Sequence, residues 1–225
     1  MRVLIACEES QVVCTAFRAR GHEAYSADIQ EPSGGHPEWH ILGDVLPLIN
    51  GYCTFTTMGG RTHRIDDTWD LLIAHPPCTF LTKAGGNRIT IKGVRNEERY
   101  QEGLKAKAFF MEFYTCNAKR ICIENPIPLK MFGLPSYTQI IQPFMFGDKY
   151  MKTTCLWLIR LPPLFATDIV VPEYKLVNCS DHRKKKRPDT WQTGGARSAK
   201  ARSKTAPGIA RAMAEQWGGK DDGER

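Results

Sequence analysis

Short apolar runs that alternate with helix-like stretches constrain this chain more than any other feature of its sequence. Five runs, bounded by polar residues, glycine or proline, predict β-strands at residues 2–6, 23–28, 69–74, 120–123 and 154–159. Apolar residues at helical spacing predict helices at 12–20, 97–118 and 207–217. Strands that alternate with helices in this way favour an α/β fold built on a mostly parallel sheet.

The length and composition fit one globular domain with a small appendage. The chain has 225 residues, enough for a single substantial core but cramped for two. Hydrophobic residues make up 42% and charged residues 24%, which excludes wholesale disorder, coiled coil and collagen. The apolar run at 2–6 is too short for a signal peptide, and no run reaches the ~20 residues of a membrane span. We expect a monomeric, soluble, cytoplasmic protein that binds no membrane.

The basic residues are unevenly distributed. The net charge is +7, and residues 183–204 contain nine lysines and arginines against one acid, Asp189. Clustered basic residues gain affinity for a polyanion by displacing counterions from its phosphates, which predicts DNA as a partner. A solvated basic loop explains the same run equally well.

Cysteine and histidine spacings favour neither a metal site nor a disulfide framework. The eight cysteines include no pair at the spacing of a zinc knuckle. His36 and His40 have a helical metal-ligand spacing, but Pro37 lies between them and favours a loop with ordinary hydrogen bonds. We therefore predict no bound metal.

Polar residues follow several predicted strands at their carboxyl ends, where open α/β sheets bind ligands. These are residues 7–10, Asp28, Asp44, Cys78 and Glu124. An acid such as Asp28 can accept hydrogen bonds from ribose hydroxyls, although an acid in a turn can equally serve the backbone. The first turn carries Glu8 and Glu9 where dinucleotide-binding proteins have glycines. These carboxylates repel a pyrophosphate and suit a cationic cofactor such as S-adenosylmethionine.

Two turns at strand ends carry a thiol and a carboxylate. Pro76-Pro77-Cys78 follows one strand, and Glu124-Asn125-Pro126 follows another. They resemble, in order, the Pro-Cys-Gln and Glu-Asn-Val turns of the DNA (cytosine-5) methyltransferase family. Residues 146–154 look like the family's Gln-x-Arg-x-Arg segment, and residues 203–217 are similar to its closing helix. The resemblance thus spans nearly the whole chain.

The resemblance implies a Rossmann-like methyltransferase fold with helices on both faces of the sheet, S-adenosylmethionine as cofactor and cytosine in DNA as substrate. Cys78 would attack C6 of the base, Glu124 would bind N3 and the exocyclic amine, and Lys152 stands at the first arginine position of the family. The residues implied to contact the cofactor are Ala6, Cys7, Glu8, Ser10, Asp28, Ile29, Asp44, Pro76 and Ser203. Those expected to contact DNA are Lys83, Arg88, Arg183, Lys184, Lys185, Lys186 and Arg187. Lys83 and Arg88 are also expected to lower the pKa of the Cys78 thiol.

The sequence departs from the family pattern at identifiable places. The first turn lacks Phe-x-Gly-x-Gly, Thr79 replaces the glutamine after the nucleophile, and Thr154 replaces the second arginine. Only residues 162–202 lie where family members insert a recognition domain, so we expect a catalytic domain at 1–162, a reduced basic recognition region at 163–202 and a closing helix at 203–225. Three alternatives stay open: the same chemistry on a free pyrimidine nucleotide, a catalytically silent DNA-binding relative, and a structural cysteine with an unrelated surface glutamate.

Overall fold

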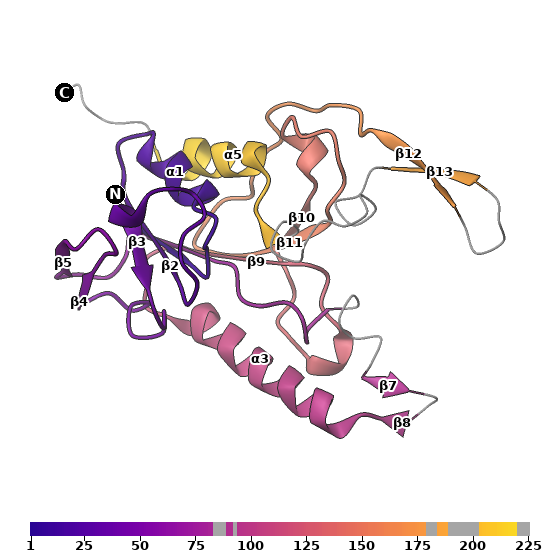
Figure 1. The fold of residues 1–225 in the computed structure, drawn as a ribbon, viewed down its shortest axis with the longest axis horizontal. Coiled ribbons are helices and arrows are strands. Elements are labelled where there is room, and N and C mark those ends of the chain that lie inside the picture. The colour runs from indigo at the N-terminus through magenta and orange to yellow at the C-terminus, as the bar shows by residue number, and fades with distance from the viewer. Residues whose placement is uncertain (83–88, 92–93, 179–183, 189–202, 220–225) are drawn as a thin grey trace.

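A seven-stranded sheet forms the centre of the molecule (Figure 1). The computed structural model describes residues 1–82, 89–91, 94–178, 184–188 and 203–219, without the side chains of 91, 175–178 and 184–188. The strand order is β10-β11-β9-β6-β1-β2-β3, with β1 to β3, β6 and β9 parallel and β11 antiparallel to both its neighbours. The strands are β1 Arg2–Ala6, β2 Glu23–Asp28, β3 His40–Leu42, β6 Leu71–Ala74, β9 Ile121–Asn125, β10 Gln139–Ile141 and β11 Thr154–Ile159. The predicted α/β class with a mostly parallel sheet is confirmed.

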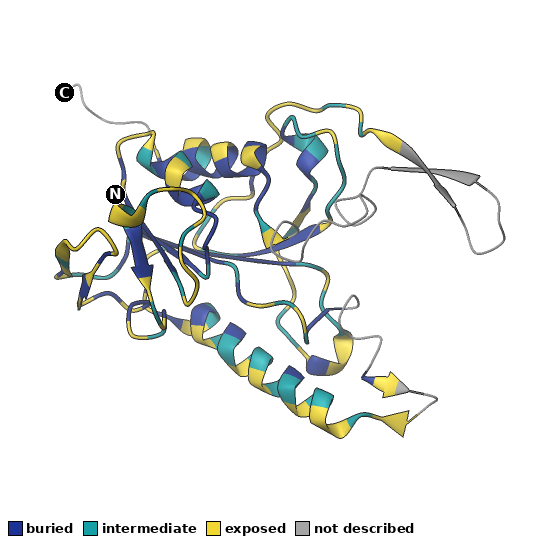
Figure 2. Cartoon of the chain, in the orientation of Figure 1, coloured by how far each residue is buried: buried dark blue, intermediate teal, exposed yellow. Residues whose placement is uncertain are grey.

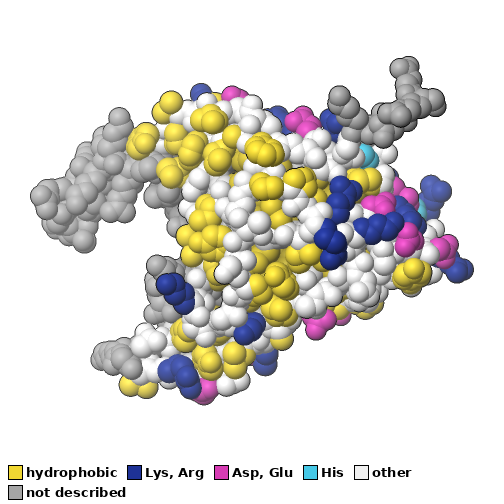
Figure 3. Space-filling view, turned by 180° about the vertical axis from the view of Figure 1, so that it is seen from behind, with side chains coloured by type: hydrophobic (Ala, Val, Ile, Leu, Met, Phe, Trp, Pro, Cys, Tyr) yellow, Lys and Arg dark blue, Asp and Glu magenta, His cyan; other side chains and the backbone are white. Residues whose placement is uncertain are grey.

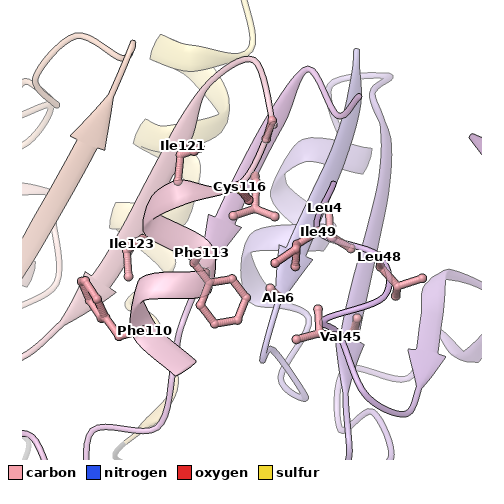
Figure 4. Packing of buried hydrophobic residues seen from close by; sticks show 14 of the residues in the cluster. Leu4, Ala6, Val45, Leu48, Ile49, Phe110, Phe113, Cys116, Ile121 and Ile123 are labelled. Carbon is pink, nitrogen blue, oxygen red and sulfur yellow. The ribbon is translucent and has the colours of Figure 1, made fainter. Parts of the chain in front are cut away.

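Helices cover both faces of this sheet, as predicted. Helices α1 (Val12–Arg18) and α5 (Pro207–Trp217) pack together on one face, and α3 (Glu97–Thr115) lies on the other (Figure 1). Side chains of β1 alternate between the two layers because successive residues of a strand point to opposite faces. Val3 and Ile5 pack with α1 and α5. Leu4 and Ala6 pack into the cluster that contains Phe110 and Phe113 of α3 (Figure 4). Figure 2 shows the resulting buried sheet between the half-exposed helices.

Several predicted boundaries are wrong. The helix predicted at 12–20 ends at Arg18, and the strands predicted to begin at residues 69 and 120 begin at Leu71 and Ile121. The helix predicted at 97–118 ends at Thr115, because Cys116 adopts an extended backbone, with ψ 165°. The strand predicted to stop at residue 123 continues to Asn125, because β11 pairs with it in register there: Leu156 opposes Glu124 and Cys155 opposes Asn125. Glu124 therefore lies on a rigid strand rather than in a turn.

Smaller elements surround the central sheet. Three two-stranded hairpins pair β4 (Cys53–Thr56) with β5 (Thr62–Ile65), β7 (Thr90–Ile91) with β8 (Val94–Arg95), and β12 (Tyr174–Asn178) with β13 (Lys184–Pro188). Short 3-10 helices occur at Pro37–Trp39, Lys130–Phe132 and Pro143–Met145. Among the described residues, no helix has the length and apolar character needed to cross a bilayer.

Candidate active site

A crevice is expected where the sheet reverses its strand order, between the carboxyl ends of β1 and β6. From β1 the chain builds outward through β2 and β3, then returns to place β6 on the opposite side of β1. The turn after β1 (residues 7–11) and the turn after β6 (residues 75–78) therefore meet, with the end of β9 beside them. A backbone hydrogen bond of 2.9 Å, from His75 N to Ala6 O, ties the two turns together.

Glu124 is the centre of a buried polar cluster at this edge. Its Oε2 atom lies 3.2 Å from His75 Nδ1 and accepts a 3.1 Å hydrogen bond from Thr205 Oγ1. Its Oε1 atom lies 3.8 Å from Lys152 Nζ. Burial alone would raise the pKa of this carboxyl, but the Lys152 ammonium, His75 and Thr205 outweigh burial and lower the pKa to about 2. Glu124 is thus a carboxylate at any physiological pH.

Cys78 lies half-buried on the same edge, where two prolines stop β6 from continuing. Its carbonyl accepts hydrogen bonds from Leu81 N at 3.1 Å and from Thr82 Oγ1 at 3.2 Å, which fixes the turn. Burial raises the pKa of the Cys78 thiol, Lys152 acts to lower it, and Glu124 raises it further. The thiol therefore lies within electrostatic reach of both Lys152 and Glu124.

The expected activation of Cys78 by its own loop stays a prediction. Lys83 and Arg88, the cations predicted to lower the thiol pKa, lie outside the described residues. Among the described residues, Lys152 is the cation that acts on Cys78, and burial outweighs it. The sulfur is thus a thiol in the free protein, and a thiolate needs further stabilisation from whatever binds beside it.

Lys152 is held in place by contacts from three segments. Its backbone N–H donates to Gln142 Oε1 at 3.0 Å, and its ammonium donates to the carbonyl of Lys204 at 3.0 Å. The side chain of Lys204 in turn donates to Ser33 Oγ at 3.0 Å. Residues 204–205 therefore form a strap before α5 that reaches both the loop after β2 and the Glu124 cluster.

The first turn is built differently from a phosphate-binding turn. Glu8 accepts hydrogen bonds from Val13 N at 2.6 Å and Cys14 N at 3.2 Å, so its carboxylate occupies the amino end of α1. Burial raises the pKa of Glu8 to about 7, against the lowering effects of His75 and these two N–H groups. Cys7 and Gln11 both have φ 58°, a left-handed backbone that non-glycine residues rarely adopt. Because Glu8 occupies the amino end of α1, this helix terminus is not available to bind a cofactor phosphate.

Two carboxylates, which can accept hydrogen bonds, lie beside the first turn. Asp28 is half-exposed at the end of β2, and Asp44 is exposed beyond β3. Burial and then the charges of Asp28 and Asp44 raise the pKa of Cys7 to about 12, so the three residues lie near one another. Ile29 is 80% exposed and offers an apolar surface there. Two carboxylates and an exposed apolar side chain therefore lie near the turn after β1.

Other residues predicted to contact the cofactor are less available. Ala6 and Pro76 are buried, and their carbonyls accept hydrogen bonds from His75 N and Asn125 Nδ2. Ser10 is also buried, whereas Ser203 is exposed. In the closing segment it is Thr205, rather than Ser203, that reaches Glu124. No sequence signal indicates this contact beyond a polar residue just before Pro207.

The residues predicted to contact DNA are only partly described. Arg183, like Lys83 and Arg88, lies outside the described residues. Lys184, Lys185, Lys186 and Arg187 belong to β13, which pairs antiparallel with β12. Figure 1 shows this hairpin extending away from the central sheet. On the face seen in Figure 3, the described lysines and arginines are spread over several places, some beside acidic side chains.

The two histidines with a helical metal-ligand spacing have structural partners. His36 stacks on Trp39 with ring centres 3.8 Å apart, and the buried His40 contacts Ser26 Oγ and the carbonyl of Gln30. The described part of the chain contains no cluster of three or more histidines, cysteines or acids that could hold a metal. A hollow of about 310 Å³ lies beside Trp39 and Tyr25, around the amino end of β2 and therefore away from the crevice.

No protein-family model matches the chain, and no curated protein matches it significantly. At the carboxyl edge of the sheet, the described residues bring together the Cys78 thiol, the Glu124 carboxylate, the Lys152 ammonium group and the His75 imidazole.

Proposed function

We propose that this chain is an S-adenosylmethionine-dependent enzyme that methylates cytosine at C5 in DNA through a covalent adduct with Cys78. The observation that carries the proposal is the arrangement at the carboxyl edge of the sheet. The half-buried Cys78 thiol shares this edge with the Glu124 carboxylate, and Lys152 acts on both. These are the three groups that attack on a pyrimidine ring requires.

Cys78 would supply the nucleophile. C5 of cytosine is a poor nucleophile, and addition of a thiolate to C6 forms an S–C6 bond while the C5=C6 electrons shift to give an enamine. C5 would then take a methyl group from the cofactor's sulfonium, whose S–CH3 bond would break to leave a neutral thioether. Transfer of the C5 proton to water would afterwards restore the C5=C6 double bond and break the S–C6 bond, which frees the thiolate. The Lys152 ammonium favours the thiolate form that this sequence needs.

Glu124 would hold the base. Oε2 is already bonded to Thr205 and lies against His75, so Oε1 is the oxygen available to an incoming ring. An ionised carboxylate accepts hydrogen bonds only, and the exocyclic amine of cytosine is a matching donor. The nearby Lys152 can stabilise negative charge that develops on the ring during attack.

The cofactor supplies an electrophilic methyl group when it is bound. Asp28 and Asp44 are the acids suited to its hydroxyl and cationic groups, and Ile29 is suited to its adenine ring. Glu8 holds the first turn by capping α1. This assignment is supported by the switch point between β1 and β6, since the turn after β1 lies next to the turn that carries Cys78.

DNA is favoured as substrate by the basic run that includes β13, since a free nucleotide needs no such charge. The short segment 162–202 favours the alternative, a free pyrimidine nucleotide. Incubation with labelled S-adenosylmethionine, and either duplex DNA or dCMP, separates them. We expect label in DNA with wild type and Cys53→Ala, and none with Cys78→Ala. Label in dCMP alone would support the alternative. No label, with no heat on calorimetric titration with the cofactor, would indicate a silent DNA-binding relative.

A further inference from the structure

His75 stands between two carboxylates from different strands. It follows β6 directly, three positions before Cys78, and its side chain is 13% exposed. Its Nδ1 atom lies 3.2 Å from Glu124 Oε2, and the Glu8 carboxylate lies close enough to act on it by charge. Its Nε2 atom is buried without a hydrogen-bond partner among the described residues. The imidazole therefore contacts the buried Glu124 carboxylate through Nδ1, and its Nε2 atom is not exposed to solvent.

The charge of Glu124 depends on its neighbours. Among the described residues, the titratable and charged groups that act on it are His75 after β6, Lys152 before β11, Glu8 after β1, Cys78, and Cys122 of β9 itself; Thr205 adds a hydroxyl. Burial acts to lower the pKa of His75, but Glu124 and Glu8 outweigh burial and Lys152, so that the pKa is raised. His75 thus carries its proton to higher pH than an ordinary histidine, and the imidazolium stabilises the Glu124 carboxylate.

We propose that His75 is a positioning residue that keeps Glu124 an oriented carboxylate, and that this makes the crevice selective for a pyrimidine with an exocyclic amine over one with an exocyclic oxygen. The inference rests on the proposed function. With Oε2 fixed against His75 and Thr205, Oε1 meets the exocyclic group. A carboxylate accepts from an amine and repels a carbonyl oxygen, whereas a protonated carboxyl can donate to that oxygen. The charge of Glu124 therefore decides between cytosine and uracil.

Competitive trapping measures this selectivity. Two duplex oligonucleotides with different labels, one carrying 5-fluorocytosine and one 5-fluorouracil, compete for the enzyme with S-adenosylmethionine at pH 5 to 8. Both adducts need the same thiolate, so the ratio of adducts cancels the titration of Cys78. The variants are His75→Gln, which removes the charge but keeps a donor, and His63→Gln, a histidine of the β4–β5 hairpin, as the matched control.

We expect wild type and His63→Gln to prefer 5-fluorocytosine equally at every pH. In His75→Gln the pKa of Glu124 should rise, so the preference should survive at pH 8 and fall measurably below that of wild type as the pH approaches 5. A His75→Gln ratio that follows wild type throughout would overturn this inference and leave the proposed function standing. Absence of any adduct with wild type would overturn both.

A measurement that does not need the His75 variant tests the same pair. Nuclear magnetic resonance titration of the His75 ring in wild type and in Glu124→Gln reports their coupling. Loss of the Glu124 charge should lower the pKa of His75 by about one unit or more. An unchanged titration would contradict the assignment even if His75→Gln does not fold.

Discussion

The hydroxyl of Thr205 donates a 3.1 Å hydrogen bond to Glu124 Oε2, a contact between residues 81 positions apart in the sequence. Beside it, the carbonyl of Lys204 accepts a 3.0 Å bond from Lys152 Nζ. Helix α5 then packs on α1, and Gly208 lies so close to the carbonyl of Phe146 that no side chain fits there. The last helix thus fixes a strap across the edge that carries Glu124.

Replacing the Thr205 hydroxyl should weaken the site. Thr205→Val keeps the shape but leaves Glu124 without one donor, which we expect to cost about 1 kcal/mol in the free energy of unfolding and to raise the pKa of Glu124. Methyl transfer should fall with it. Thr205→Ser retains the hydroxyl and is the matched control. Urea unfolding and initial rates check this prediction, and equal behaviour of the two variants would show that the bond is unimportant.

Glu8 should make the protein less stable as the pH rises. The folded-state pKa of about 7 exceeds the ordinary value of 4.5, so folding favours the protonated form. This stabilisation is complete below pH 4.5 and is lost as the pH rises through 7. Glu8→Gln mimics the protonated carboxyl. It should exceed wild type in the free energy of unfolding at pH 8, by on the order of 1–3 kcal/mol, and not at pH 4.

Urea unfolding of wild type and Glu8→Gln at the two pH values tests this prediction. A difference between the proteins that is the same at pH 4 and pH 8 would mean that folding does not shift the pKa of Glu8, as for an exposed glutamate, and would contradict this prediction.

Asp28 should contribute to cofactor affinity. Asp28→Ala removes the acid that suits the ribose hydroxyls, and we expect S-adenosylmethionine to bind about tenfold or more weakly in calorimetry. Asp66→Ala in the turn after β5 removes an exposed acid elsewhere and should bind as wild type does. Unaltered affinity of Asp28→Ala would place the cofactor, if it binds, away from the end of β2.

The basic run should set the salt dependence of DNA binding. Changing residues 183–187 to serine should lower affinity and reduce the slope of log K against log salt by about 0.9 for each phosphate that is no longer neutralised. A control that replaces an equal number of exposed basic residues tests for net charge alone: Arg20, Arg61, Arg64, Lys105 and Arg211. If both proteins show the same reduction in slope, the run has no local role.

Much of the fold could be predicted because local pattern determines it. The runs at 2–6, 23–28 and 154–159 and the helix at 207–217 coincide with β1, β2, β11 and α5. The hydrophobic periodicity of each segment indicates whether one or both of its faces are buried. Packing between the sheet and the helices buries those faces. The gathering of Cys78 and Glu124 on one edge follows from parallel strands, whose carboxyl ends point the same way.

The rest depends on contacts that periodicity does not encode. Glu124 belongs to a strand because Leu156 pairs with it, and Thr205 reaches it only after the chain has folded back. The sequence predicts that Glu8 contacts a cofactor, yet its carboxylate accepts a hydrogen bond at the amino end of α1. The residues next to Glu8 in the sequence do not indicate this orientation. The burial that raises the thiol pKa likewise arises only in the packed molecule.

Covalent trapping tests the central claim most directly. Wild type, Cys78→Ala and Cys53→Ala are incubated with S-adenosylmethionine and a duplex oligonucleotide that contains 5-fluorocytosine, then denatured, digested and analysed by mass spectrometry. The account predicts an adduct on the peptide that contains Cys78 in wild type and Cys53→Ala, and none in Cys78→Ala. An adduct that persists in Cys78→Ala, or that maps to another cysteine, would contradict it.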